Sequence, residues 1–225
     1  MATVLFATTR IPFPPWEGHQ IRTYNLLKSV SKIHDVHLLS FVRKDEDKSH
    51  AEHLKKICAS VELLEIPAEM NRPLFITLLL KGILLDKPYV VRKYFSPQML
   101  EKLQKDISRM SPDLIHFDML PLTQYLPFCN GIPIILNEHN VESLLLQRRA
   151  GNGHTVFSRI FFSSQAKKLS RFEKWACRSA EQVLACSRED AVTLQEMSGG
   201  RPVEVIANGV DIGYFTPREV PEFDR

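Results

Sequence analysis

The chain has 225 residues, of which 44% are hydrophobic and 24% are charged, a composition typical of a folded globular protein and not of a disordered or fibrous one. Its net charge is only +3 and no nucleic-acid-binding motif is found, so we expect no nucleic-acid partner. The apolar stretch at residues 3–7 is short and lacks the basic lead of a secretory signal. The longest apolar run, residues 74–85, is too short to span a bilayer. We therefore predict a cytoplasmic protein.

The four cysteines form no C-x-x-C pair, and their spacing matches no zinc-binding pattern. All of them lie in apolar or helical contexts, which favours buried, reduced thiols. We predict no metal ion bound by these residues, which are Cys58, Cys129, Cys177 and Cys186.

Short apolar segments alternate along the chain with segments whose apolar residues recur at helical spacing. The pattern predicts seven strands, at residues 3–7, 36–41, 61–66, 114–117, 133–136, 182–186 and 202–206. It predicts helices at residues 20–31, 45–59, 73–85, 97–109, 121–128, 141–149, 157–179 and 188–197. This alternation predicts an α/β fold, namely a Rossmann-like, doubly wound, mainly parallel sheet of about seven strands.

We expect one domain at residues 1–207, followed by an interdomain linker at residues 208–225. The turn at Asn208-Gly209, two prolines beyond it and the loss of periodicity indicate the linker. In doubly wound sheets ligands bind at the carboxyl ends of the strands, so the segments that follow the strands are the candidate functional sites.

The loop after the first predicted strand contains three prolines and ends at Gly18. A glycine at the start of a helix lets backbone N–H groups approach a ligand, and the helix N-terminus favours negative charge. The alternative is a plain tight turn, because the G-x-G-x-x-G dinucleotide fingerprint is absent.

Polar side chains also follow two later strands. His116 and Asp118 end one strand on a shared face, and burying such a pair is costly unless it has a partner or a task. The alternative is that Asp118 caps the next helix. Four polar residues, 137–140, follow the next strand, where His or Glu could move a proton and Asn could bind hydroxyls. Helix capping by Asn140 would account for only one of the four.

Four segments, taken together, resemble one enzyme family. Residues 18–27, the Pro112-Asp113-Leu114-Ile115-His116 strand and the Asn208-Gly209-Val210-Asp211 segment resemble the family 4 glycosyltransferases of the GT-B fold, a retaining group. Residues 137–140 resemble the sugar transferases of bacterial exopolysaccharide systems. Asp118 stands where many relatives have a second histidine.

The resemblance implies the N-terminal, acceptor-side half of a two-domain enzyme, with the donor-binding C-terminal domain absent from this chain. The full-length enzyme would transfer a hexosyl group from a nucleotide-sugar to a glycan or lipid-linked acceptor, with retention of configuration and without a metal or other cofactor. The isolated chain would be inactive. Alternatives are a non-catalytic sugar- or phosphate-binding module and a two-domain enzyme such as a nucleotide-sugar epimerase.

The resemblance also implies roles for single residues. The expected catalytic residues are Asp118 and His139. The expected acceptor-binding residues are His19, Arg22, His116, Glu138 and Asn140. Glu17 and Gly18 are expected at the donor phosphates. Asn208, Gly209 and Asp211 are expected at the junction between domains.

Peripheral contact with the inner face of a membrane is a further hypothesis. The helix at residues 157–179 is basic, and Arg92 and Lys93 follow the apolar helix at residues 73–85. The alternatives are that the basic helix is an ordinary solvated surface helix and that the apolar helix belongs to the core.

Overall fold

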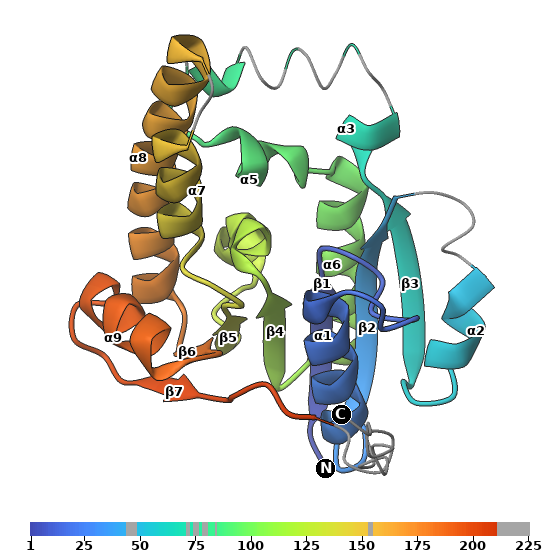
Figure 1. Cartoon of the computed structure of the whole chain (residues 1–225). Helices are drawn as coiled ribbons and strands as arrows, with labels where there is room; N and C mark the ends of the chain where they lie inside the picture. Colours follow the sequence, from blue (N-terminus) through green and yellow to red (C-terminus); the bar gives the residue numbers. More distant parts are fainter. Residues whose placement is uncertain are drawn as a thin grey trace, which may run out of the picture.

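The computed structural model describes residues 1–43, 49–70, 73, 77, 81–83, 85–152 and 155–210, which form a single parallel sheet with helices packed against it (Figure 1). The sheet has seven strands in the order β3-β2-β1-β4-β5-β6-β7, and every neighbouring pair is parallel. The predicted α/β doubly wound fold is thus confirmed. The strands are β1 (Thr3–Thr8), β2 (Asp35–Val42), β3 (Ser60–Glu65), β4 (Leu114–Asp118), β5 (Ile134–Asn137), β6 (Gln182–Ala185) and β7 (Val203–Val205).

The helices connect these strands in the alternating order that the sequence predicts. They are α1 (Gly18–Val30), α2 (Ala51–Leu54), α3 (Pro67–Met70), α5 (Tyr89–Lys93), α6 (Pro97–Met110), the 3-10 helix η2 (Leu120–Phe128), α7 (Glu142–Gly151), α8 (Val156–Ser179) and α9 (Arg188–Met197). None of the helices in the described part of the chain is both long and apolar enough to cross a membrane.

The side chains of β1 alternate between two cores, one on each face of the sheet. Val4 and Phe6 pack with Leu27 of α1 and Leu54 of α2 on one face. On the other face Leu5 and Ala7 belong to a larger core, which includes buried side chains of α6, η2, α8 and α9. Burial on both faces explains why the strands appear in the sequence as short apolar runs.

Several helices differ from the prediction. The helix predicted at 45–59 is only the four residues of α2, and residues 44–48 lie outside the described part. Most of the helix predicted at 73–85 also lies outside it. The helix predicted at 121–128 is a 3-10 helix that contains Pro127; proline has no N–H to donate and disfavours a regular α-helix. The sequence analysis missed α3 and α5, which are one turn each.

The strand order indicates the edge of the sheet at which a ligand is expected to bind. The chain adds strands on one side of β1 as far as β3 and then returns to add β4 on the other side. Ligands in such sheets bind beside this switch point, at the carboxyl ends of the strands. The segments after β1, β4 and β5 meet there.

Candidate active site

The carboxylate of Asp118 is the centre of a buried hydrogen-bond network at the switch point. Its Oδ1 accepts hydrogen bonds from Asn137 Nδ2 (2.6 Å) and His139 Nε2 (2.9 Å), and its Oδ2 accepts one from the Thr23 hydroxyl (2.6 Å). Asp118 is only 2% exposed. The predicted catalytic pair, Asp118 and His139, is therefore in direct contact.

Three elements bring these groups together. Asp118 ends β4 and pairs in register with Asn137, the last residue of β5. Since side chains alternate along an extended segment, Asn137 and His139 face the same way and Glu138 faces the other way. Thr23 comes from α1, which covers this face of the sheet. The alternative that Asp118 caps the following helix is wrong, because η2 has Met119 at its N-cap and no side-chain cap.

The partners of Asp118 keep it ionised. Burial by itself would raise the pKa of this carboxyl group, but the adjacent His139, His116 and Thr23 lower it to about 2. Because Nε2 of His139 donates to the carboxylate, the neutral ring has its lone pair on Nδ1. No described residue hydrogen-bonds to Nδ1. This histidine is thus oriented and has one nitrogen left for a ligand.

His116 is close to this pair but is not joined to it. Its Nε2 lies 4.0 Å from Asp118 Oδ1, and its ring stacks on Phe6 with the centroids 4.1 Å apart. Burial lowers the pKa of His116 to about 4, so the ring is neutral at physiological pH. The structure places this predicted acceptor-binding residue in the wall of the site, where it is an uncharged side chain.

Arg22 connects the network to the end of the described chain. Its Nη2 donates to Asn137 Oδ1 (2.9 Å), while Nη1 donates to Ile206 O (2.5 Å) and Asn208 Oδ1 (3.1 Å). Arg22 was expected to bind the acceptor, but the structure commits its guanidinium to these oxygens. Asn208, expected at a domain junction, is thereby fixed against α1. Gly209 lines a hollow of about 600 Å³ between α1 and residues 206–210, and Asp211 lies outside the described residues.

The N-terminus of α1 lies beside the site. Glu17 is the N-cap residue, and its Oε1 accepts a hydrogen bond from Arg10 Nη1 at 2.8 Å. This contact lowers the pKa of Glu17. A Cβ atom added at Gly18 would meet no atom within 4 Å, so a side chain at this position would not clash with other segments. His19 is half-buried, and this burial lowers its pKa, partly opposed by the nearby Glu17. A carboxylate cannot itself bind a phosphate, so of the two residues predicted at the donor phosphates only Gly18 suits that role.

Two further predicted residues lie apart from the network. Glu138 is 1% exposed, and burial together with the nearby Glu173 and Glu142 raises its pKa well above the usual value. It is therefore an interior side chain whose surroundings disfavour the ionised form. Asn140 is exposed and does not cap α7, whose N-cap residue is Val141.

A carboxyl group from another helix caps α7 instead. Glu173 of α8 accepts hydrogen bonds from the backbone N–H groups of Glu142 (2.7 Å) and Ser143 (3.3 Å), and from the Ser143 hydroxyl. Burial raises the pKa of Glu173 to about 7, although these hydrogen bonds oppose the shift. The contact fixes α7 against α8 directly behind the active-site edge.

Thr23 and Asn137 are absent from the residues predicted individually for the site, yet they supply two of the three hydrogen bonds to Asp118. Asn137 lies in the polar run after β5, which was the available signal. Thr23 lies inside a helix and gave none. Among the described residues, no group of three or more His, Cys, Asp or Glu side chains is placed to hold a metal ion.

The parallel α/β sheet places the domain in the doubly wound class, in which ligands bind at the switch point, here next to a buried carboxylate–histidine pair. The family described as Glycosyltransferase Family 4 matches residues 16–214, which is most of the chain. The chain belongs to this family. The expectation drawn from the four sequence segments is confirmed at the family level.

The matches to individual proteins are weaker than the match to the family. No curated protein matches the sequence significantly. Solved structures with similar folds include TcCGT1 in complex with UDP, with a TM-score of 0.49 and 14% identity over 99% of this chain and 54% of that one. The N-terminal domain of trehalose-6-phosphate phosphatase from Candida albicans has a TM-score of 0.49 and 16% identity over 95% of this chain and 50% of that one. This chain thus spans about half the length of each.

The hydrogen bonds of Arg22 predict that it anchors residues 206–208. In Arg22→Lys, one ammonium group cannot reach all three oxygens in the geometry of the guanidinium fork. We expect the Ile206 amide, which bonds to Ala185 O, to exchange with solvent about tenfold faster, as measured by hydrogen–deuterium exchange. Arg109→Lys on the exposed surface of α6 is the matched control. Equal exchange in both variants would show that the segment is held without Arg22.

Proposed function

We propose that this chain is the acceptor-side domain of a retaining glycosyltransferase. The complete enzyme would transfer a hexosyl group from a nucleotide-sugar to a glycan or lipid-linked acceptor. The observation that carries the proposal is the ionised Asp118 hydrogen-bonded to His139 at the switch point of a family 4 chain. A carboxylate and an oriented histidine at this edge suit the binding of a hydroxyl nucleophile.

In this proposal His139 orients the attacking hydroxyl. With Nε2–H donated to Asp118, Nδ1 accepts the hydrogen bond of the acceptor hydroxyl. Asp118 fixes the tautomer and the ring orientation, while Asn137 and Thr23 hold Asp118. Attack on the face from which the nucleotide diphosphate departs would retain the anomeric configuration. The hydroxyl proton would then pass to the departing phosphate oxygen, so His139 need not act as a strong base.

The donor diphosphate would lie at the N-terminus of α1. The first N–H groups of a helix have no partner within the helix, and its dipole favours negative charge. Gly18 places no side chain at this terminus, and Arg10 offsets the charge of Glu17. A donor-binding domain, absent from residues 1–207, would cover the nucleotide from the other side. We include no metal or cofactor in this mechanism.

We extend the proposal to the cell. The protein would be a cytoplasmic enzyme of bacterial exopolysaccharide synthesis and would contact the membrane through α8. Val156 and Phe157 are each 73% exposed in the first turn of α8. Lys167 and Lys174 are exposed further along the helix, on the same face as Val156 at 3.6 residues per turn. Apolar residues beside cations suit an anionic bilayer surface.

Other cations named for this surface are used within the chain. Lys168 donates to the carbonyl oxygens of Gly82, Ile83 and Leu85. Lys93 forms an ion pair with Glu69 at 2.5 Å. Arg92 Nε donates to Lys87 O at 3.0 Å. The membrane hypothesis therefore rests on α8 alone.

The first prediction from this function concerns turnover. In the longer polypeptide that includes a donor-binding half, Asp118→Asn and His139→Gln should each lower kcat by about a hundredfold or more. KM for the nucleotide-sugar should change little, because the proposal assigns the donor to the backbone N–H groups at the start of α1 and to neither of these side chains. His37→Gln is the control: its ring bonds to Ser60 at the amino ends of β2 and β3. Radiolabelled sugar transfer gives both constants.

The product of the same reaction tests the stereochemistry. We expect the proton NMR spectrum of the first-formed product to show the anomeric configuration of the donor. An inverted product would overturn the retaining mechanism and would make His139 a candidate general base. Full activity in Asp118→Asn would remove the carboxylate from the catalytic site. A chain that binds sugar without transferring it would favour the non-catalytic module.

The membrane part is tested by vesicle flotation. The wild-type chain should float with vesicles that contain phosphatidylglycerol and stay in solution with pure phosphatidylcholine. Lys167→Gln/Lys174→Gln should lower the bound fraction severalfold, because each basic residue near an anionic surface contributes about 1 kcal/mol. Lys56→Gln/Lys105→Gln makes the same change of net charge elsewhere. Flotation that is independent of anionic lipid would contradict the proposal.

A further inference from the structure

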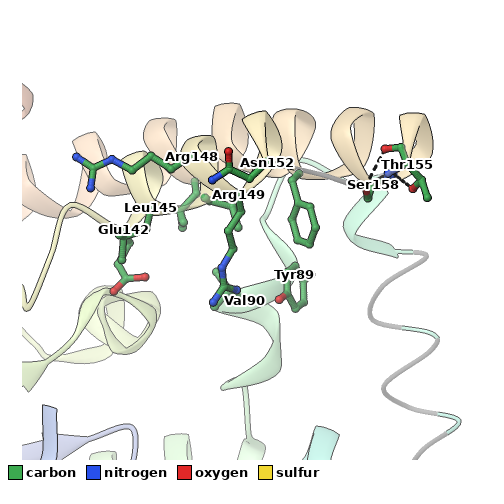
Figure 2. Close-up of a pocket in the computed structure, with 12 residues that line it drawn as sticks. Tyr89, Val90, Glu142, Leu145, Arg148, Arg149, Asn152, Thr155 and Ser158 are labelled. Carbon is green, nitrogen blue, oxygen red and sulfur yellow. Dashed lines mark hydrogen bonds between the residues drawn. The ribbon is translucent and has the colours of Figure 1, made fainter. Parts of the chain in front are cut away.

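A hollow of about 680 Å³ lies between α5, α7 and α8 (Figure 2). Much of its wall is apolar: Val90 comes from α5, Leu145 and Leu146 from α7, and Phe162 and Leu169 from α8. These side chains bring hydrocarbon surface to an open space beside the carboxyl edge of the sheet. The wall therefore suits an apolar ligand group.

Two arginines of α7 also line this hollow. Figure 2 shows Arg149 extending from α7 toward Val90 on α5, whereas Arg148 points away along α7. Both side chains are exposed, and neither has a hydrogen-bond or ion-pair partner within the described part of the chain. Arg149 thus presents its guanidinium fork over an apolar wall, with an electrostatic interaction with Glu142 but no hydrogen bond to it. A guanidinium binds phosphate and carboxylate groups through two parallel hydrogen bonds.

The hollow lies near the active site, because Glu142 in its wall interacts electrostatically with His139. Glu142 lines one end of it and follows His139 by three residues. Glu142 also lies seven residues, or two helical turns, before Arg149 on the same helix. Its carboxyl group is electrostatically coupled to both His139 and Arg149. A ligand with its hydroxyl at His139 could thus extend past Glu142 and reach Arg149.

We propose that this hollow is the acceptor subsite and that the acceptor is an anionic amphiphile, with a phosphate-type group at Arg149 and a hydrocarbon group against Leu145, Leu146 and Phe162. The inference rests on the proposed function and narrows its acceptor from glycans in general to acidic molecules with an apolar part. A neutral oligosaccharide would leave the apolar wall uncovered and the cation unpaired. Inorganic phosphate would leave the wall in contact with water.

The test is a calorimetric titration of the 225-residue chain with decyl phosphate below its micellar concentration. Decyl glucoside and inorganic phosphate serve as the uncharged and the non-apolar comparison. We expect decyl phosphate to bind more tightly than either. Arg149→Gln should weaken the binding of decyl phosphate about tenfold or more and leave that of decyl glucoside unchanged. Arg109→Gln on α6 removes the same charge elsewhere and should have no effect.

A second variant separates the hollow from the exposed surface of α8. Leu145→Ser should weaken the binding of decyl phosphate and decyl glucoside by the same factor, with an unchanged circular dichroism spectrum as the control for folding. Equal binding of the two decyl compounds, or equal loss in Arg149→Gln and Arg109→Gln, would overturn the anionic subsite. Tight binding of inorganic phosphate alone would overturn the apolar part of the proposal.

Different results would overturn the acceptor subsite and the glycosyltransferase function on which it rests. Sugar transfer by the longer polypeptide without Arg149-dependent binding of decyl phosphate would overturn the subsite alone. Arg149-dependent binding without any sugar transfer would overturn the glycosyltransferase function, and the hollow would then be a binding site without a reaction. When both hold, Arg149→Gln should raise KM for the acceptor and leave KM for the nucleotide-sugar unchanged.

Discussion

The arrangement of this domain depends on keeping one carboxylate ionised in its interior. An isolated buried charge is so costly that the group would normally take up a proton. Asp118, at the end of β4, avoids this because Asn137 of β5, His139 just after it and Thr23 of α1 each place a donor within 3 Å of its oxygens. The three elements meet only at the switch point, where parallel strands end side by side. The same contacts orient His139, so the condition that stabilises the charge also builds the proposed site.

The sequence was enough to predict the edge of the sheet where Asp118 lies, but not the hydrogen bonds that this residue makes there. Alternating apolar runs were enough to predict seven strands, and the polar residues after them identified Asp118 and His139. Thr23 could not be found in this way, because it bonds to an aspartate 95 positions away and lies on an otherwise ordinary helix. Spacing along the chain carries no information about such a pair. The short helices α3 and α5 were missed for a similar reason: a single turn has no measurable period.

Two assignments went beyond what local geometry supports. The alternation that put His116 and Asp118 on one face also separates Glu138 from Asn137 and His139, so Glu138 belongs to the interior with Glu173. Lys168 looked like part of a free basic surface, yet three carbonyl oxygens from a distant segment accept its protons. The charge of Glu138 was interpreted as function, whereas the fold buries this residue. For Lys168 the sequence left an ordinary surface helix open, and the fold uses the ammonium group within the chain.

Asn137 shows how the site and the end of the domain are physically linked. Its amide donates a hydrogen bond to Asp118 through Nδ2 and accepts one from Arg22 through Oδ1. One planar group therefore positions both Asp118 and Arg22. Arg22 also holds Ile206 and Asn208, at the start of the proposed junction to a donor-binding domain. A displacement of that segment would therefore move the guanidinium, and with it the amide that supports the carboxylate. Because the amide is planar, the position of the 206–208 segment and the geometry of the Asp118–His139 pair are set together.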